Sequence, residues 1–133
     1  MSEAPPPGDG PSGAIGLSYE SFGEDEVRAE VPVSPAVLQV FGVVHGGVYS
    51  LIAESMCSEA TLRAVAADGM AAIGMSNSAT FLRPISEGTI HATATARHKG
   101  RTTWVWDTEF TDDEGRVAAL VRMTIAVRPR PGG

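Results

Sequence analysis

A change of hydrophobic period at Gly69 is the feature of this sequence that most limits its fold. Before it, from Gly46 to about Ala67, apolar side chains recur at helical spacing, and Asp68-Gly69 predicts a helix stop. After it, apolar residues alternate with small or polar ones, with the period of two that is typical of strands, until Pro129. We therefore expect one long helix followed by several strands.

Four strands are predicted after the helix and two before it. The later four are expected to form a meander, over about 73–81, 90–97, 102–110 and 117–127. Before the helix, residues 14–33 alternate on both sides of a break at 23–25, which predicts a hairpin. Ser34-Pro35 then predicts a short helical turn through Val40. One helix against an antiparallel sheet of about six strands is an α+β layer architecture.

Length and composition indicate one domain. The chain has 133 residues, which suits a single core spanning 14–130. Residues 1–13 are rich in Pro, Gly and Ser and are predicted to form a disordered leader, and 131–133 a short tail. Ten basic against sixteen acidic residues, with no run of Lys or Arg, argue against a nucleic-acid partner.

The cellular setting is also predicted from composition. The single cysteine, Cys57, excludes a disulfide scaffold and favours a reducing compartment. No apolar run approaches the roughly 18 residues of a membrane span, and the N-terminus has no basic-then-apolar signal pattern. We expect a cytoplasmic protein with no membrane association.

Small and polar residues interrupt the apolar helix every three or four positions. They are Gly47, Ser50, Glu54, Ser58 and Thr61. Residues at this spacing share one helix face, so we expect a single polar stripe that faces something other than sheet. A carboxylate is costly to bury without a purpose, so Glu54 is the first candidate for chemistry.

Several of these features resemble hot-dog-fold acyl-CoA thioesterases. They are the order of elements, His45-Gly46-Gly47 at the start of the only long helix, and Glu54 nine positions after His45. Within that group the chain is most similar to glutamate-dependent 4-hydroxybenzoyl-CoA and phenylacetate-pathway thioesterases. The resemblance covers roughly residues 15–130. Supporting segments are Gln39, Ser58, SNSATFLRPISEG at 76–88, TTWVWD at 102–107 and IAVRPR at 125–130.

The resemblance implies a hot-dog fold, an acyl-CoA substrate and no cofactor, because coenzyme A arrives as part of the substrate. It also implies active sites at a homodimer interface, with dimers often paired into homotetramers. By the same resemblance, Arg83 and the pair Arg101-Thr102 match positions that contact the nucleotide, phosphates or pantetheine, and Arg128 and Arg130 are looser candidates in a tail that varies within the family. Arg101 departs from the closest relatives, in which a small hydroxyl residue is common.

Thioester hydrolysis gives each motif residue a chemical role. The N–H of Gly46 at a helix N-terminus can stabilise the oxyanion, and glycine at 46 and 47 allows a ligand to approach closely. Glu54 can attack the carbonyl or deprotonate a water, and both routes end in acid and thiol. Gln39 can hold the carbonyl or the water, and Ser58 can orient the Glu54 carboxylate.

The spacing of these residues predicts a site shared by two subunits. Gly46 and Glu54 are eight residues apart, or roughly 12 Å along a regular helix. Donor and nucleophile must both lie about 3 Å from one carbonyl group. We therefore predict two composite sites per dimer, each with Gln39 and Gly46 from one subunit and Glu54 and Ser58 from the other.

Each residue also has a structural interpretation. His45 can cap the helix or brace the turn, Gly46 and Gly47 can serve tight packing, and Glu54 can belong to an interface ion pair. His91 and His98 lie on a predicted strand with no second metal-type ligand in sight, so no metal is expected. Several residues are candidates to line the acyl pocket: Phe41, Tyr49, Met56, Trp104 and Trp106.

Two other functions stay in consideration. A hot-dog domain can bind acyl-CoA without catalysis, as a sensor or scaffold, but such a module has no need of an acid facing the thioester. A hot-dog dehydratase needs an Asp/His pair in an arrangement that this sequence does not show. Glu54 therefore favours hydrolysis.

Overall fold

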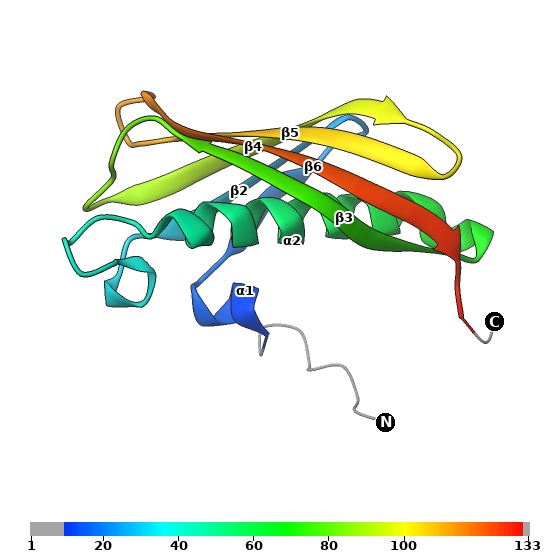
Figure 1. Ribbon diagram of the computed structural model, residues 1–133, viewed down its shortest axis with the longest axis horizontal. Helices are drawn as coiled ribbons and strands as arrows, with labels where there is room; N and C mark the ends of the chain where they lie inside the picture. Colours follow the sequence, from blue (N-terminus) through cyan, green and yellow to red (C-terminus); the bar gives the residue numbers. More distant parts are fainter. Residues whose placement is uncertain (1–9, 132–133) are drawn as a thin grey trace.

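The computed structural model describes residues 10–131 as one helix wrapped by one curved antiparallel sheet (Figure 1). The helical elements are α1 Pro11–Ala14, η1 Pro35–Val37, α2 Gly46–Val65 and η2 Ala66–Asp68. The strands are β1 Ser18–Phe22, β2 Glu26–Pro32, β3 Met70–Phe81, β4 Thr89–Lys99, β5 Thr103–Thr111 and β6 Val117–Pro129. The predicted α+β architecture of one long helix and six strands is confirmed.

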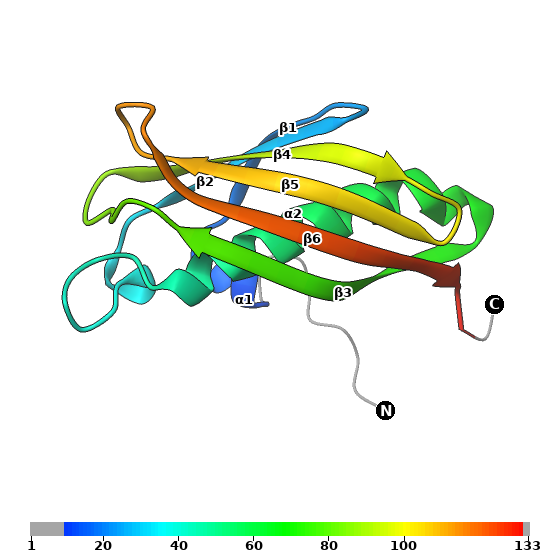
Figure 2. The same ribbon diagram turned by 45° about the horizontal axis from the view of Figure 1, so that its top comes forward.

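The order of strands in the sheet is β1-β2-β4-β5-β6-β3. The predicted meander is correct for β4, β5 and β6 but wrong for β3, which pairs with β6 rather than with β4. The segment 82–88 carries the chain from one edge to the interior of the sheet, as Figure 2 shows. β1 and β3 are consequently the two edge strands.

The core lies between α2 and the concave face of the sheet. Strand alternation places the inward side chains as the period of two requires, and β5 buries Trp104, Trp106, Thr108 and Phe110. Trp106 donates its indole N–H to Thr61 Oγ1 at 2.9 Å, and Thr61 Oγ1 donates to the carbonyl of Cys57 at 2.7 Å. The tryptophans are therefore core residues.

The limits of α2 follow its sequence signals. His45 is the N-cap residue, and after η2 Gly69 takes a φ of +74°, a left-handed conformation that glycine adopts without strain. Cys57 is fully buried, and burial raises the pKa of its thiol to about 12. Cys57 is thus a structural residue in this chain.

The predicted polar stripe on α2 is correct from Gly47 to Ser58 but wrong at Thr61. Ser50, Glu54 and Ser58 are partly or fully exposed, whereas Thr61 is completely buried against the sheet. β3 and β6 are inclined to the helix axis (Figure 1), and β3 lies beside Gly46, Ser50 and Glu54, whereas Thr61 faces Trp106 of β5. The sector of the helix that the sheet covers therefore rotates along the helix, and it includes Thr61.

Two boundaries near the N-terminus differ from prediction. The expected leader 1–13 lies outside the described residues up to Asp9, but Pro11–Ala14 forms α1, which packs on the side of α2 away from the sheet (Figure 1). The turn after Ser34 is a 3-10 helix that ends at Val37 rather than Val40. Ser34 Oγ caps it by accepting from the N–H of Ala36 at 3.3 Å.

Candidate active site

The N–H of Gly46, at the N-terminus of α2, has no acceptor among the described residues. His45 Nδ1 accepts from the N–H of Gly47 at 2.9 Å, and the carbonyl of His45 accepts from the N–H of Val48 at 2.9 Å. His45 is thus the helix cap, and its Nε2 carries the ring proton when the imidazole is neutral. Among residues 10–131, no acceptor is bonded to the N–H of Gly46. The geometry therefore singles out Gly46 as the available donor and shows Gly47 engaged by His45.

The ring of Phe81 lies close against Gly46. A β-carbon at this position would lie 2.7 Å from Phe81 Cζ, closer than real β-carbons approach another heavy atom. Because Phe81 is 56% exposed and its ring tip can move, the contact favours glycine at residue 46 without requiring it. At residue 47 a β-carbon would lie 3.2 Å from His45 Nδ1, so a larger residue there would have to displace the capping ring slightly.

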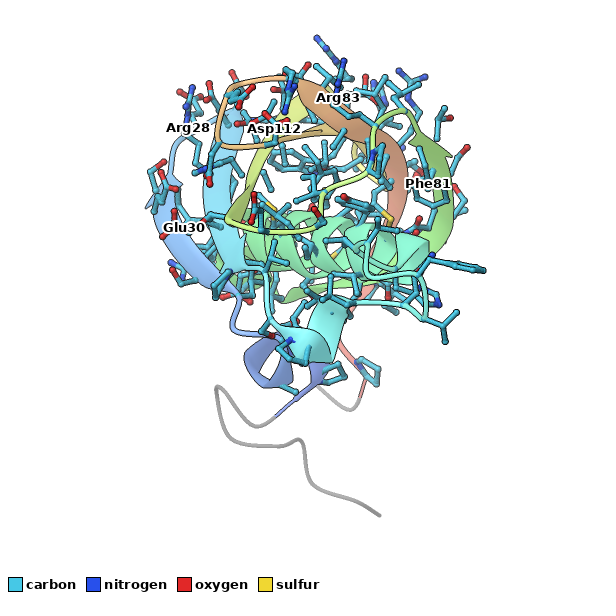
Figure 3. All side chains as sticks on the ribbon, turned by 90° about the vertical axis from the view of Figure 1, so that its left-hand side faces the viewer. Arg28, Glu30, Phe81, Arg83 and Asp112 are labelled. Carbon is cyan, nitrogen blue, oxygen red and sulfur yellow. The ribbon has the colours of Figure 1, made fainter. Side chains whose placement is uncertain are left out.

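A cavity of about 360 Å³ opens beside this helix end. Its walls are Val43, Val44, Gly46, Tyr49, Phe81, Leu82, Arg83 and Pro84. Arg83 is exposed and lies with Phe81 at the β3 side of the molecule, opposite Arg28 and Glu30 (Figure 3). The structure thus brings the predicted Gly46 and Arg83 to one cavity that is otherwise mostly apolar.

Gln39 lies in the tight loop that precedes the helix. Its backbone N–H donates to the carbonyl of Val43 at 2.8 Å, and its side-chain Oε1 accepts from the N–H of Phe41. The acceptor end of the amide is therefore occupied within the loop, which leaves the NH₂ group as the end that can act on a ligand. The next two residues, Val40 and Phe41, are 94% and 86% exposed.

Glu54 is exposed in the single chain, so the expectation of a buried carboxylate is wrong at this level of assembly. Its carboxylate lies against β3, where a β-carbon on Gly74 would be 3.6 Å from Glu54 Oε2. Ser58 lies one turn further along α2 and is partly exposed. Among the described residues, Ser58 makes no hydrogen bond to Glu54. Both side chains therefore face outward beside the edge strand.

The remaining predicted substrate contacts gather at the opposite end of the molecule. Arg128 Nη1 donates to the carbonyl of Thr102 at 2.6 Å, and Arg101 is the exposed neighbour of Thr102 in the β4–β5 turn. Met70 of β3 pairs with Pro129 at this end, whereas Phe81, next to the Gly46 cavity, pairs with Ala119. At about 3.3 Å per strand residue, the two ends are roughly 36 Å apart.

The expectation of no metal assumes that no second metal-type ligand lies near His91, and this assumption is wrong. His91 has two carboxylates beside it, since the ligand atoms of Glu20, Glu30 and His91 all lie within 4.8 Å of one another. His91 Nε2 also lies 2.8 Å from Asp113 Oδ1. This cluster is on the convex face of the sheet, where Glu30 and His91 alternate with inward-facing residues (Figure 3).

Sequence reasoning missed two contacts between β3 and α2. Asn77 Nδ2 donates to the carbonyl of Ser50 at 2.9 Å and so ties the edge strand to the helix. Phe81 covers Gly46, as described above. The sequence around an asparagine or a phenylalanine in a strand does not predict which residue it contacts. These contacts depend on where β3 passes the helix, which the pairing of the whole sheet determines.

Comparison with known proteins identifies the family. Residues 41–119 match the model of the thioesterase superfamily, which is more than half of the chain. The sequence is 36% identical over 118 residues to the esterase PA1618 of Pseudomonas aeruginosa, covering 89% of this chain and 81% of that protein. This chain therefore belongs to the thioesterase superfamily, and it is a thioester hydrolase.

Solved structures support the same assignment and the hot-dog fold. A crystal structure of a variant of thioesterase PA1618 superposes with a TM-score of 0.88 at 33% identity, covering 91% of this chain and 87% of that one. Thioesterase HI1161 of Haemophilus influenzae gives a TM-score of 0.86 at 31% identity, over 91% of this chain and 84% of that one. Within residues 10–131, no helix has the length and apolar character needed to cross a membrane.

Proposed function

We propose that this protein hydrolyses an acyl-CoA thioester with an aromatic acyl group, of the hydroxybenzoyl or phenylacetyl type, to free acid and coenzyme A. The observation that carries the proposal is the placement of Gly46 and Glu54. Both contact the edge strand β3, Gly46 through Phe81 and Glu54 beside Gly74. A free oxyanion donor and a carboxylate thus lie along one exposed edge, each with half of the chemistry that a thioester requires.

A two-fold axis at β3 unites the two halves. β3 is twelve residues long and contains neither Lys nor Pro, the residues that commonly protect an edge, and no strand of residues 10–131 pairs with its outer side. Ile73 and Met75 are 54% and 58% exposed on it. Antiparallel pairing of two β3 strands about an axis near Asn77 and Ser78 sets Gly74 of one subunit opposite Phe81 of the other. Glu54 then approaches the Gly46 cavity of the partner subunit.

The reaction follows from this arrangement. The thioester carbonyl oxygen accepts from the N–H of Gly46, and the NH₂ group of Gln39 holds the carbonyl or the water. Glu54 of the other subunit either attacks the carbonyl carbon or removes a proton from a water that attacks it. The C–S bond breaks, and the thiolate takes a proton as it leaves. In the first route, water then hydrolyses the mixed anhydride and frees Glu54. Ser58 orients the carboxylate or the water.

The same axis gives coenzyme A a continuous path. In one chain Arg83 lies at the Gly46 end, while Arg101, Thr102 and Arg128 lie at the other. In an antiparallel dimer, the Gly46 end of one subunit lies toward the end of the partner subunit that carries Arg101, Thr102 and Arg128. We propose that the phosphates and pantetheine follow this mixed set of residues, that dimers pair into tetramers, and that the enzyme works in the cytoplasm.

A thiol-release assay over a panel of acyl-CoA thioesters tests the proposed function. We expect wild-type protein to release coenzyme A from an aromatic thioester, and Glu54→Ala to lose at least a hundredfold in kcat. The control is Glu59→Ala, which removes another glutamate of the same helix, one that pairs with Arg63 at 3.2 Å. Equal turnover by wild type and Glu54→Ala would show that Glu54 has no catalytic role. Tight acyl-CoA binding without turnover would favour the non-catalytic module.

Subunit mixing tests whether the sites are composite. Gly46→Pro removes the donor half of a site and Glu54→Ala removes the carboxylate half. Random reassociation of equal amounts makes about half of all dimers mixed, and each mixed dimer has one intact site of two. We therefore expect about a quarter of wild-type activity to return. Activity no greater than that of the separate variants would show that each site belongs to one chain.

A further inference from the structure

Tyr49 is a buried residue whose hydroxyl group is unsatisfied. Its side chain is 3% exposed, and none of residues 10–131 offers a hydrogen-bond partner to its phenol oxygen. Buried polar groups in native proteins are nearly always paired, and an exception in a folded domain calls for an explanation. In the family to which this chain belongs, a substrate is the natural candidate for the missing partner.

The surroundings of Tyr49 keep it neutral. Its ring packs edge-on against Phe110 at 5.1 Å and lies 6.0 Å from the ring of Phe81. Burial raises its pKa to about 12, so at neutral pH the phenol is protonated. A neutral phenol can both donate and accept a hydrogen bond. It therefore suits an uncharged polar group such as a hydroxyl or an oxo oxygen.

Tyr49 also lines the cavity that contains Gly46. It lies three residues after Gly46, so the two occupy one face of α2, roughly 4.5 Å apart along the axis. An acyl group whose carbonyl oxygen is held at Gly46 would extend along the wall that Tyr49 forms. Phe81, which is 56% exposed, is the aromatic neighbour with most freedom to move and admit it.

We infer that Tyr49 is a specificity-determining residue whose phenol hydrogen-bonds an uncharged hydroxyl or oxo substituent on the acyl group. The inference rests on the proposed function, since it places the acyl group in the Gly46 cavity. A site that hydrogen-bonds a substrate hydroxyl rejects an analogue that lacks it, because the buried partner is then left unpaired. Tyr49 would thus select hydroxylated acyl groups over apolar ones of the same size.

Matched substrates test the inference. The assay compares kcat/KM for 2-, 3- and 4-hydroxybenzoyl-CoA with the corresponding methylbenzoyl-CoA, in which a methyl group replaces the hydroxyl. We expect wild type to favour at least one hydroxyl isomer by about tenfold or more. In Tyr49→Phe the same ratio should fall to within about threefold of unity. Tyr19→Phe, at the far edge of the sheet, is the control and should keep the wild-type ratio.

Thermal unfolding without ligand gives a second readout. Because the hydroxyl of Tyr49 has no partner among residues 10–131, Tyr49→Phe should leave Tm unchanged or raise it. A fall of more than about 4 °C would show that the hydroxyl is satisfied in the free protein and would overturn the inference. Thiol release with the same hydroxyl preference in Tyr49→Phe as in wild type would also overturn it while leaving the proposed function intact. No thiol release from any thioester would remove the proposed function itself.

Discussion

Replacing Gly46 with proline removes the backbone N–H donor from the proposed oxyanion site and bonds the ring Cδ to that nitrogen instead. Gly46 is the first residue of α2, a position where proline fits a helix. His45 has a ψ of 133°, the extended conformation that a residue before proline prefers. The N–H of Gly46 bonds to no acceptor among the described residues, so its loss breaks no described hydrogen bond. The variant should therefore fold.

Gly46→Ala is the matched control. Both substitutions add a β-carbon that meets Phe81, but alanine keeps the N–H. Removing one oxyanion donor costs roughly 10² to 10³ in kcat, or about 2.7 to 4 kcal/mol. We expect Gly46→Pro to be slower than Gly46→Ala by that factor in steady-state thiol release, with KM less affected.

The comparison holds even if the contact with Phe81 disturbs both variants. Pairing each substitution with Phe81→Ala relieves the close approach and should leave the difference between proline and alanine in place. Turnover within about threefold for the two variants, in either background, would refute the assignment of Gly46 as the donor. A similar melting temperature for the two would confirm that the comparison concerns chemistry.

Three further predictions concern assembly and stability. Ser78→Lys should place two like charges opposite each other at the proposed two-fold axis, so both the dimer fraction in sedimentation and the activity should fall. Ser21→Lys, on the other edge strand, should change neither the dimer fraction nor the activity. Thr61→Val should cost about 1 to 3 kcal/mol in urea unfolding by orphaning the buried Trp106 N–H, and much less in a Trp106→Phe background. Hydrogen bonds from Arg122 and then Arg97 lower the pKa of Asp107. The ionised carboxylate therefore stabilises the fold above its ordinary pKa near 3.8, and this stabilisation is lost as pH falls below that value. Asp107→Asn should remove this part of the loss of stability in acid, and an unchanged dependence of stability on pH would contradict the prediction.

The elements could be predicted from the sequence because each carries its own periodicity. The limits of α2, the inward residues of β5 and β6, and the turn at Gly69 all follow local rules. The position of β3 could not be predicted in the same way. Alternation tells which face of a strand is buried but not which strand lies beside it, so the sequence predicts β3 in the meander whereas the structure pairs it with β6.

The difference between local patterns and long-range packing also explains which features of the candidate site could be predicted. His45 and Gly46 lie at one helix end, where the sequence predicts the start of the helix. Thr61 shares a helix face with Glu54 by spacing, yet one is buried and the other exposed, because the sheet crosses the helix at an angle. The contact between Phe81 and Gly46 and the unpaired hydroxyl of Tyr49 depend on packing between distant segments, which no local pattern reports.

The unpaired edge of β3 has a consequence for how much of this enzyme is active at a given abundance. If each subunit holds two half-sites and no complete one, the number of working sites follows mass action. Diluting the protein below its dimer dissociation constant should then lower activity per subunit in proportion to concentration. Substrate that bridges two subunits would oppose that loss, so acyl-CoA would promote assembly of the enzyme that consumes it.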